Sequence, residues 1–313
     1  MSNSRRTSAA VTAAALICVA ATGCGSGSGK GGEGKDIKLG LALSTLDNPF
    51  FVEMKKGAEA EAKAQGATLN VQDAQNDASQ QANQIQNFTS QNVKSIIVNP
   101  VDSDAAAPSV KAADNAGIPV VAVDRTVNKA KVATTVASDN VTGGKKAAQE
   151  LAKQLDEQGS ILVLRGQPGT SASRERGEGF MSAIKKYPDI EIAGKQSANF
   201  ERAKGLDVTT NLLQSHPDVT GIFAENDEMA LGAVKALGGK AGKQVKVVGF
   251  DGTPDGFKAI KKGTLNTSIA QQPAALGKMA VRNAIRKVQG SNPDSEIKVP
   301  VITVDRKNVD EYS

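Results

Sequence analysis

The stretch IKLGLALSTLDNPFFVEMKKGAEAEA, residues 37–62, decides the fold. It begins with an apolar run at residues 37–43 and continues through a short polar segment. Apolar side chains then recur at the spacing of a helix, at Phe51, Met54, Ala58 and Ala62. This order predicts a buried strand, a loop and an amphipathic helix. Repetition of that unit builds a parallel sheet covered by helices on both faces.

The same alternation continues along the chain. Further short apolar runs, read as strands, lie at residues 68–71, 95–98, 119–123, 132–137, 161–164, 191–193, 219–224, 245–250 and 266–270. Helical patterns lie between the later runs at 141–155, 173–186, 201–215, 227–237 and 254–262, with a last helix near 273–288 and a last strand near 299–305. About ten strands are too many for one compact domain of about 130 residues. We therefore predict an α/β fold with two doubly wound parallel-sheet domains.

The N-terminus has the pattern of an export signal. Arg5 and Arg6 precede an apolar run at residues 9–21, which is too short to span a bilayer and ends in small residues followed by Cys24. This resembles a bacterial lipoprotein signal, so we expect residues 1–23 to be removed and Cys24 to be lipidated. The alternative is an ordinary cleavage site with an incidental cysteine. Residues 24–35, rich in Gly and Ser, are predicted to form a flexible tether.

Composition argues against several classes of protein. One His and two Cys cannot form a zinc site of the two- or three-His type, an iron–sulfur site or a disulfide-rich scaffold. The net charge of +5 would fall to +3 without residues 1–23, and no basic stripe of the kind that binds nucleic acid is present. No second apolar stretch approaches transmembrane length. We therefore predict no metal, no cofactor and no nucleic-acid partner.

Polar and aromatic residues follow the predicted strands. In open α/β sheets, ligands bind beyond the carboxyl ends of the strands. The residues there are mainly Asn, Asp, Arg, Gln and Phe, at positions 44–51, 99–100, 124–125, 138–140, 166–176, 199–200, 226–227, 251–252 and 271. Planar polar groups can pair with hydroxyls, and aromatic faces can cover the C–H surface of a ring. This set is typical of a sugar site.

Each of these residues also has a purely structural interpretation. Asn48 before Pro49, and Asn226 or Asp227 before the next helix, could be helix caps. Asp124 and Arg125 could form a surface ion pair. Arg176 is harder to explain structurally, because a cation in the first turn of a predicted helix opposes the helix dipole.

Nine segments carry a family resemblance: STLDNPFF (44–51), IIVNPVDSDA (96–105), PVVAVDR (119–125), ASDNVTGG (137–144), GTSASRERGEGF (169–180), NFERAKGL (199–206), FAENDEMALGA (223–233), VVGFDGTPDG (247–256) and SIAQQP (268–273). With these segments the chain resembles the ribose-binding proteins of bacterial ABC importers, which have the type I periplasmic-binding-protein fold. The resemblance runs from about residue 36 to residue 304. Departures, such as Asp47 and the segment 305–313, lie outside the matched site positions.

The resemblance implies a set of sugar-binding residues: Asn48, Phe50, Phe51, Asn99, Asp124, Arg125, Arg176, Phe200, Asn226, Phe250, Asp251 and Gln271. It also implies two lobes, residues 36–138 plus 272–298 and residues 139–271 plus 299–313, joined by three crossovers that form a hinge. The expected function is capture of D-ribose, not catalysis. The expected partners are the membrane subunits of an ABC permease. The expected state is a monomer held by Cys24 at the outer face of the cytoplasmic membrane, or free in the periplasm.

Three alternatives stay open at this point. The same receptor role could serve allose, galactose or the furanose-like signal autoinducer-2. A secreted sugar-active enzyme could use Asp124 and Asp251 as a carboxylate pair. A transcriptional regulator with this fold would need a helix-turn-helix N-terminus, where residues 1–34 show an export pattern instead.

Overall fold

The computed structural model describes residues 37–312, which belong to one compact unit. The predicted signal peptide, the tether and Cys24 lie outside the described residues. Within residues 37–312, no helix has both the length and the apolar character needed to cross a membrane.

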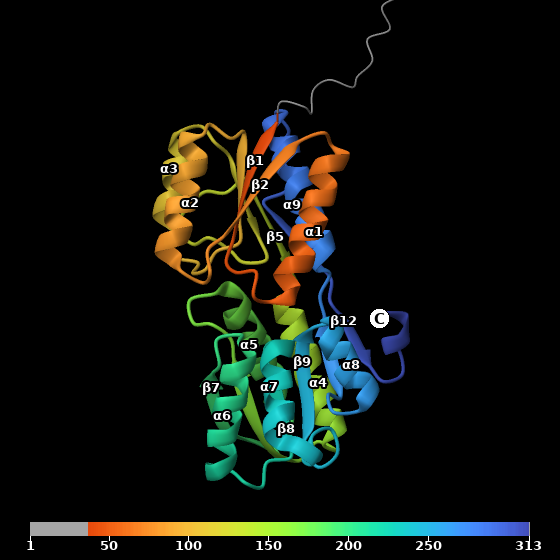
Figure 1. Ribbon diagram of the computed structural model, residues 1–313. Helices are drawn as coiled ribbons and strands as arrows, with labels where there is room; N and C mark the ends of the chain where they lie inside the picture. Colours follow the sequence, from red (N-terminus) through yellow and green to blue (C-terminus); the bar gives the residue numbers. More distant parts are fainter. Residues whose placement is uncertain (1–36, 313) are drawn as a thin grey trace, which may run out of the picture. The chain divides into compact units, whose positions relative to one another are not determined.

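The first sheet is wholly parallel. Its order is β11-β5-β4-β3-β1-β2, with β1 (Lys38–Leu43), β2 (Thr68–Asp73), β3 (Ser95–Val98), β4 (Val120–Val123), β5 (Thr134–Ser138) and β11 (Glu296–Val299). The helices α1 (Pro49–Ala64) and α9 (Pro273–Val288) cover one face, and α2 (Ala78–Ser90) and α3 (Ala107–Asn115) cover the other (Figure 1). The central strands are buried on both sides, as their continuous apolar runs predict.

The second sheet repeats this plan. Its order is β12-β10-β9-β8-β6-β7, with β6 (Gly159–Arg165), β7 (Ile190–Ser197), β8 (Gly221–Ala224), β9 (Lys246–Asp251), β10 (Thr267–Ala270) and β12 (Ile302–Asp305). One face packs on α4 (Asn140–Gln154) and α5 (Ser171–Ile184). The other packs on α6 (Arg202–Ser215), α7 (Asp227–Leu237) and α8 (Pro254–Lys262). Two short 3₁₀ turns, Gly238–Lys240 and Val309–Glu311, complete the described chain.

The chain passes between the two sheets three times. It leaves the first sheet after β5, returns between β10 and α9, and leaves again between β11 and β12. The predicted two-sheet α/β fold is therefore confirmed, with its three connections.

Some local predictions were wrong. The expected last strand at 299–305 is two strands, β11 and β12, one in each sheet, because Pro300 follows β11 and breaks the run. The second sheet is not wholly parallel, since β12 runs antiparallel to β10. The helix α3 was not predicted, and β7 extends well beyond the expected residues 191–193.

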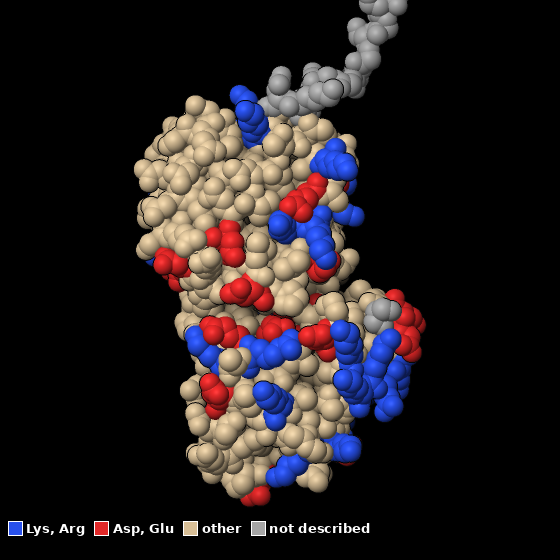
Figure 2. All heavy atoms as spheres, in the orientation of Figure 1, with Lys and Arg blue, Asp and Glu red and all other residues tan. Residues whose placement is uncertain are grey.

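Charges are mixed over the surface that Figure 2 shows. Side chains of both signs lie on the part of this face that the second sheet and its helices form (Figure 2), and Arg202 pairs with both Glu228 and Asp255.

The helices α1 and α9, which cover one face of the first sheet, approach each other closely because glycines lie at their contact. The methyl group of an alanine at Gly277 would overlap the backbone of α1 at Met54, and one at Gly57 would overlap the backbone of α9 at Ala274. The two helices therefore pack backbone against backbone. This contact also places α9 over the strands of the first sheet.

We predict that Gly277→Val destabilises the protein by about 1–3 kcal/mol, the usual range for overpacking a close contact. Gly239→Ala is the matched control, because a methyl group there meets no atom within 4 Å. Thermal and urea unfolding measure both variants. Equal stability of the two would contradict this account of the α1–α9 contact.

Candidate functional site

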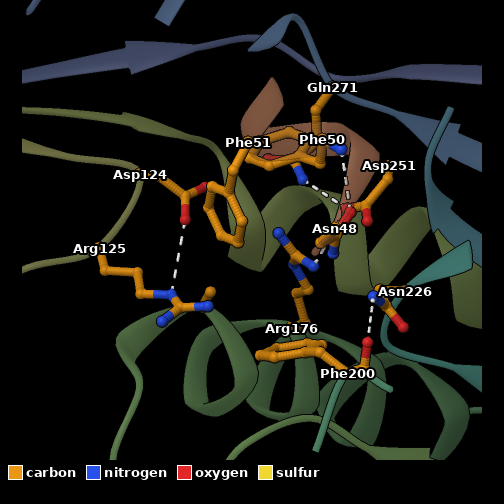
Figure 3. Close-up of a pocket in the computed structure, with 11 residues that line it drawn as sticks. Asn48, Phe50, Phe51, Asp124, Arg125, Arg176, Phe200, Asn226, Asp251 and Gln271 are labelled. Atoms are coloured by element: carbon orange, nitrogen blue, oxygen red, sulfur yellow. Dashed lines mark hydrogen bonds and ion pairs between the residues drawn. The ribbon is translucent and has the colours of Figure 1, made fainter. Parts of the chain in front are cut away.

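A small cavity lies where strand ends of the two sheets meet, with a volume of about 250 Å³. Figure 3 shows the residues that line it: Asn48, Phe50, Phe51, Asp124, Arg125, Ala172, Arg176, Phe200, Asn226, Asp251 and Gln271. Ten of them belong to the twelve predicted from the sequence.

Each lining residue occupies the carboxyl end of a strand or the first turns of the helix that follows. Those from the first sheet lie at the start of α1 or directly after β4. Those from the second sheet lie in α5, after β7, before α7, at the end of β9 and after β10. The cavity is therefore built by the topology of parallel sheets, which brings residues far apart in sequence to one edge.

Two asparagines act as helix caps and line the cavity at the same time. The Oδ1 atom of Asn48 accepts from the backbone N–H of Phe50 at 2.9 Å, and that of Asn226 accepts from Met229 at 3.0 Å. The Nδ2 atom of Asn226 also donates to the carbonyl of Phe200 at 3.2 Å. The structural interpretation and the site interpretation of these asparagines are thus compatible. The cap fixes which way each amide faces.

Arg176 is held from three sides although it is almost fully buried. Its Nε donates to Oδ1 of Asn140 at 2.9 Å, and its Nη1 donates to the carbonyl of Glu225 at 2.7 Å. Nη1 also lies 3.5 Å from Oδ1 of Asp251. The guanidinium stands 4.0 Å from the ring centroid of Phe250. Nη2 is the part of the guanidinium that these contacts leave for a ligand.

Arg125 approaches the cavity from the first sheet. Its Nη1 donates to the carbonyl of Pro100 at 2.8 Å, and its Nε lies 3.6 Å from Oδ2 of Asp124. Its guanidinium lies 5.3 Å from the ring centroid of Phe51 and 5.7 Å from that of Phe200. Burial lowers the pKa of Arg125 to about 10, although the Asp124 carboxylate opposes that shift.

The two cavity carboxylates are held in similar ways. Oδ2 of Asp124 accepts from Nδ2 of Asn99 at 3.1 Å, and Oδ1 of Asp251 accepts from Nε2 of Gln271 at 2.7 Å. Burial raises the pKa of both carboxyls, and the neighbouring arginines oppose the rise. Oδ1 of Asp124 and Oε1 of Gln271 are buried and have no hydrogen-bond partner among the described residues. Unpartnered acceptors beside a cavity are suited to ligand hydroxyls.

The backbone is strained at the same places. Asp124 has φ of 66°, Phe200 of 64° and Asp251 of 119°, a region that residues with a side chain rarely adopt. Such strain persists where the surrounding structure forces it, and it gathers at ligand sites. Here it turns the side chains that follow β4, β7 and β9 toward the cavity.

Two predicted residues, Asn99 and Phe250, do not line the cavity. Asn99 lies behind Asp124, where its Oδ1 accepts from Oγ of Ser44 at 2.6 Å. Phe250 is fully buried beneath Arg176. Ala172 lines the cavity but was missed. A small side chain directly before the predicted helix at 173–186 gives little signal of a role in a site.

Polar contacts join the two sheets' loops beside the cavity. The backbone N–H of Ser103 donates to the carbonyl of Gly169 at 3.1 Å, and that of Ser171 donates to Oγ of Ser103 at 3.3 Å. The N–H of Thr126 donates to Oγ of Ser171 at 2.9 Å. The loops of the two sheets are therefore in contact here, and they cover the cavity on the side of Ser103 and Ser171.

Comparison with known proteins shows which family has this architecture. A sequence profile described as the periplasmic binding protein domain matches residues 39–292. The ribose import binding protein RbsB of Bacillus subtilis is 44% identical over 267 residues, which cover 85% of this chain and 87% of the relative. The protein of the same name from Escherichia coli K12 is 45% identical over 261 residues, covering 83% of this chain and 88% of the relative.

Solved structures agree with the sequence relatives. An ABC transporter solute-binding protein from Bacillus halodurans with bound myo-inositol has a TM-score of 0.85 and 33% identity, covering 90% of this chain and 98% of that one. A periplasmic solute-binding protein from Actinobacillus succinogenes with bound D-allose has a TM-score of 0.83 and 34% identity, covering 88% and 99%. This chain belongs to the periplasmic binding protein family.

Proposed function

We propose that this protein is an exported receptor that captures D-ribose in the cavity and delivers it to an ABC importer. The observation that carries the proposal is the lining itself. Three phenylalanine rings share a small cavity with amide and guanidinium donors and with acceptors that lack a partner. The name of the ribose import relatives supports the same ligand.

The lining suits a neutral polyhydroxylated ring. Rings of Phe50, Phe51 and Phe200 offer apolar faces to C–H groups, while Asp124 and Gln271 accept from hydroxyls. Arginine donates in a planar fork that fits two neighbouring hydroxyls. Burying a polar group without a hydrogen-bond partner costs binding free energy. Each donor or acceptor of the lining therefore selects for a sugar with a hydroxyl at the matching position.

Binding is proposed to close the cleft. The lining comes from both sheets, so a ligand can use all of it only when the lobes are together. We propose the lobe boundaries expected from the sequence, with hinge segments near residues 138, 271 and 299. The three connections between the sheets would allow rotation of one lobe against the other while limiting their separation.

The charges favour a receptor over an enzyme. Each cavity carboxylate has an arginine beside it, Arg125 by Asp124 and Arg176 by Asp251. A neutral sugar cannot balance a buried guanidinium, and these carboxylates do so. That task leaves neither carboxylate as an unpaired acid or base. The second candidate is the same receptor role for another small polyol, which the myo-inositol and D-allose bound in the related structures favour.

We predict that the mature protein binds D-ribose with a saturable heat signal in isothermal titration calorimetry. A thermal-shift panel of pentoses, hexoses and inositol ranks the other candidates, because a ligand that binds only the native state raises Tm. Saturable binding of allose or inositol without binding of ribose would overturn the ribose assignment. It would leave the receptor role intact.

We predict that Arg176→Ala weakens sugar binding by more than about 2 kcal/mol, or about 30-fold in Kd. The reason is that the change removes a ligand donor and leaves the Asp251 carboxylate buried without its cation. Arg174→Ala is the matched control, because Arg174 lies on the same helix but is exposed. Calorimetry measures the Kd of both. An Arg176→Ala variant that folds and keeps its affinity would remove Arg176 from the site.

We also propose a lipid anchor at Cys24, which would hold the receptor near its permease. Cys24→Ser should then move the protein from the membrane fraction to the soluble fraction of the cell envelope. Mass spectrometry of the N-terminal peptide should find diacylglycerol on the native cysteine only. An unmodified native peptide beginning at another residue would contradict the anchor.

A further inference from the structure

Asp227 is a fully buried carboxylate next to the cavity, but it does not line it. It is the first residue of α7 and directly follows Asn226, whose side chain caps that helix. No arginine or lysine forms an ion pair with it among the described residues. A buried anion without a cation needs hydrogen bonds to be tolerated.

The donors of those hydrogen bonds are Thr253, two residues after Asp251, and Ser268 of β10. Oδ2 of Asp227 accepts from the backbone N–H of Thr253 at 2.8 Å and from its Oγ1 at 3.1 Å. Oδ1 accepts from Oγ of Ser268 at 2.7 Å, and that oxygen in turn accepts from the N–H of Gly252 at 3.0 Å. One carboxylate therefore holds both residues of the turn that follows Asp251.

The surrounding chain leaves room for this carboxylate. A methyl group at Gly249 would overlap its Oδ1, and a methyl group at Gly256 would overlap its Oδ2. The two glycines come from β9 and α8, the elements on either side of the turn. The absence of a side chain at both positions therefore leaves the space that the Asp227 carboxylate occupies.

The turn after β9 is important for the cavity because the backbone of Asp251, which directly precedes it, is strained. Its φ of 119° directs its carboxylate to Gln271 and Arg176, both of which line the cavity. A strained backbone keeps its conformation only where its neighbours enforce it. We propose that Asp227 is a positioning residue of the sugar site, which acts by fixing the turn after β9 and so aiming Asp251 into the cavity. This inference rests on the proposed function.

The charges around Asp227 make the proposed sugar affinity depend on pH. From β9 it faces Asp251, which is itself beside Arg176 of α5. Two further acids lie on the helices nearby, Glu228 on α7, which also holds Asp227, and Asp255 on α8. Both form ion pairs with Arg202 at the surface. The groups of β10 and of the turn that contact Asp227, namely Ser268 and Thr253, are uncharged. Burial raises the pKa of Asp227 to about 6, against the pull of its hydrogen bonds.

The sign of the pH effect follows from these pKa shifts. Burial raises the pKa of Asp251 well above its usual value, and the Asp227 charge raises it further, while Arg176 opposes both. Ionised carboxylates hold the turn and accept from the ligand, so affinity should fall as pH drops and they take up protons. Removing the Asp227 charge lowers the pKa of Asp251. The acid loss of affinity should then move to lower pH.

The test compares Asp227→Asn with the wild type by calorimetry from pH 5 to 8, using the sugar that the wild type binds in the panel above. We expect Kd at pH 8 to rise about tenfold, as for loss of a charge-assisted hydrogen bond. We also expect the acid limb of the affinity profile to shift to lower pH. A role in general stability alone would lower Tm and leave the acid limb in place.

Ser268→Ala gives a second variant if Asp227→Asn does not fold, because it removes one donor to Asp227 and the acceptor for Gly252. It should weaken binding by several fold. Thr209→Val is the matched control, since Thr209 is a buried residue of the same lobe whose hydroxyl bonds only within α6. An unchanged Kd in Asp227→Asn, or an unmoved acid limb in that variant, overturns the inference and leaves the receptor role standing; if Asp227→Asn does not fold, an unchanged Kd in Ser268→Ala does the same. A wild type that binds no sugar overturns both.

Discussion

Two guanidinium groups, one beside each sheet, are buried at the edges of one small cavity. Arg125 and Arg176 are each only 3% exposed, and the positive charge of one opposes that of the other. Burying such ions is costly unless each is paired and hydrogen-bonded. The arrangement of the strand ends follows from this constraint. Asp124 and Asp251 supply the opposite charge, and the carbonyls of Pro100 and Glu225 each accept one hydrogen bond from a guanidinium group.

The same constraint explains why a second layer of polar residues exists. Asn99 lies behind Asp124, Asn140 behind Arg176 and Asp227 behind Asp251. None of these lines the cavity. Each fixes the direction of a charged side chain that a ligand would touch, which reduces the conformational freedom to be lost on binding. The site is therefore specified as much by residues that a ligand does not reach as by those it does.

The sequence was sufficient for most of the fold and for ten of the lining residues. The apolar runs of the central strands and the polar residues after them predict which edge binds, because parallel topology gathers strand ends. It could not separate Asn99 and Phe250 from true lining residues, since residue type does not encode depth. The helix α3 went unseen because it begins without a side-chain cap and buries mainly small residues. The alternation in Glu296–Val299 and the following Pro300 were the signals that could have revealed β11.

The helix α9 has a consequence for how the protein is made. Leu276, Val281 and Ile285 complete the core that β1, β4 and α1 share, although nearly the whole second sheet lies between them in sequence. A ribosome therefore releases the first strands long before the helix that covers them. Their apolar face stays uncovered until the chain is almost finished, and the second sheet in turn waits for β12, so neither half can fold to completion early. This delay suits the proposed export, because the chain stays incompletely folded until its synthesis is nearly complete.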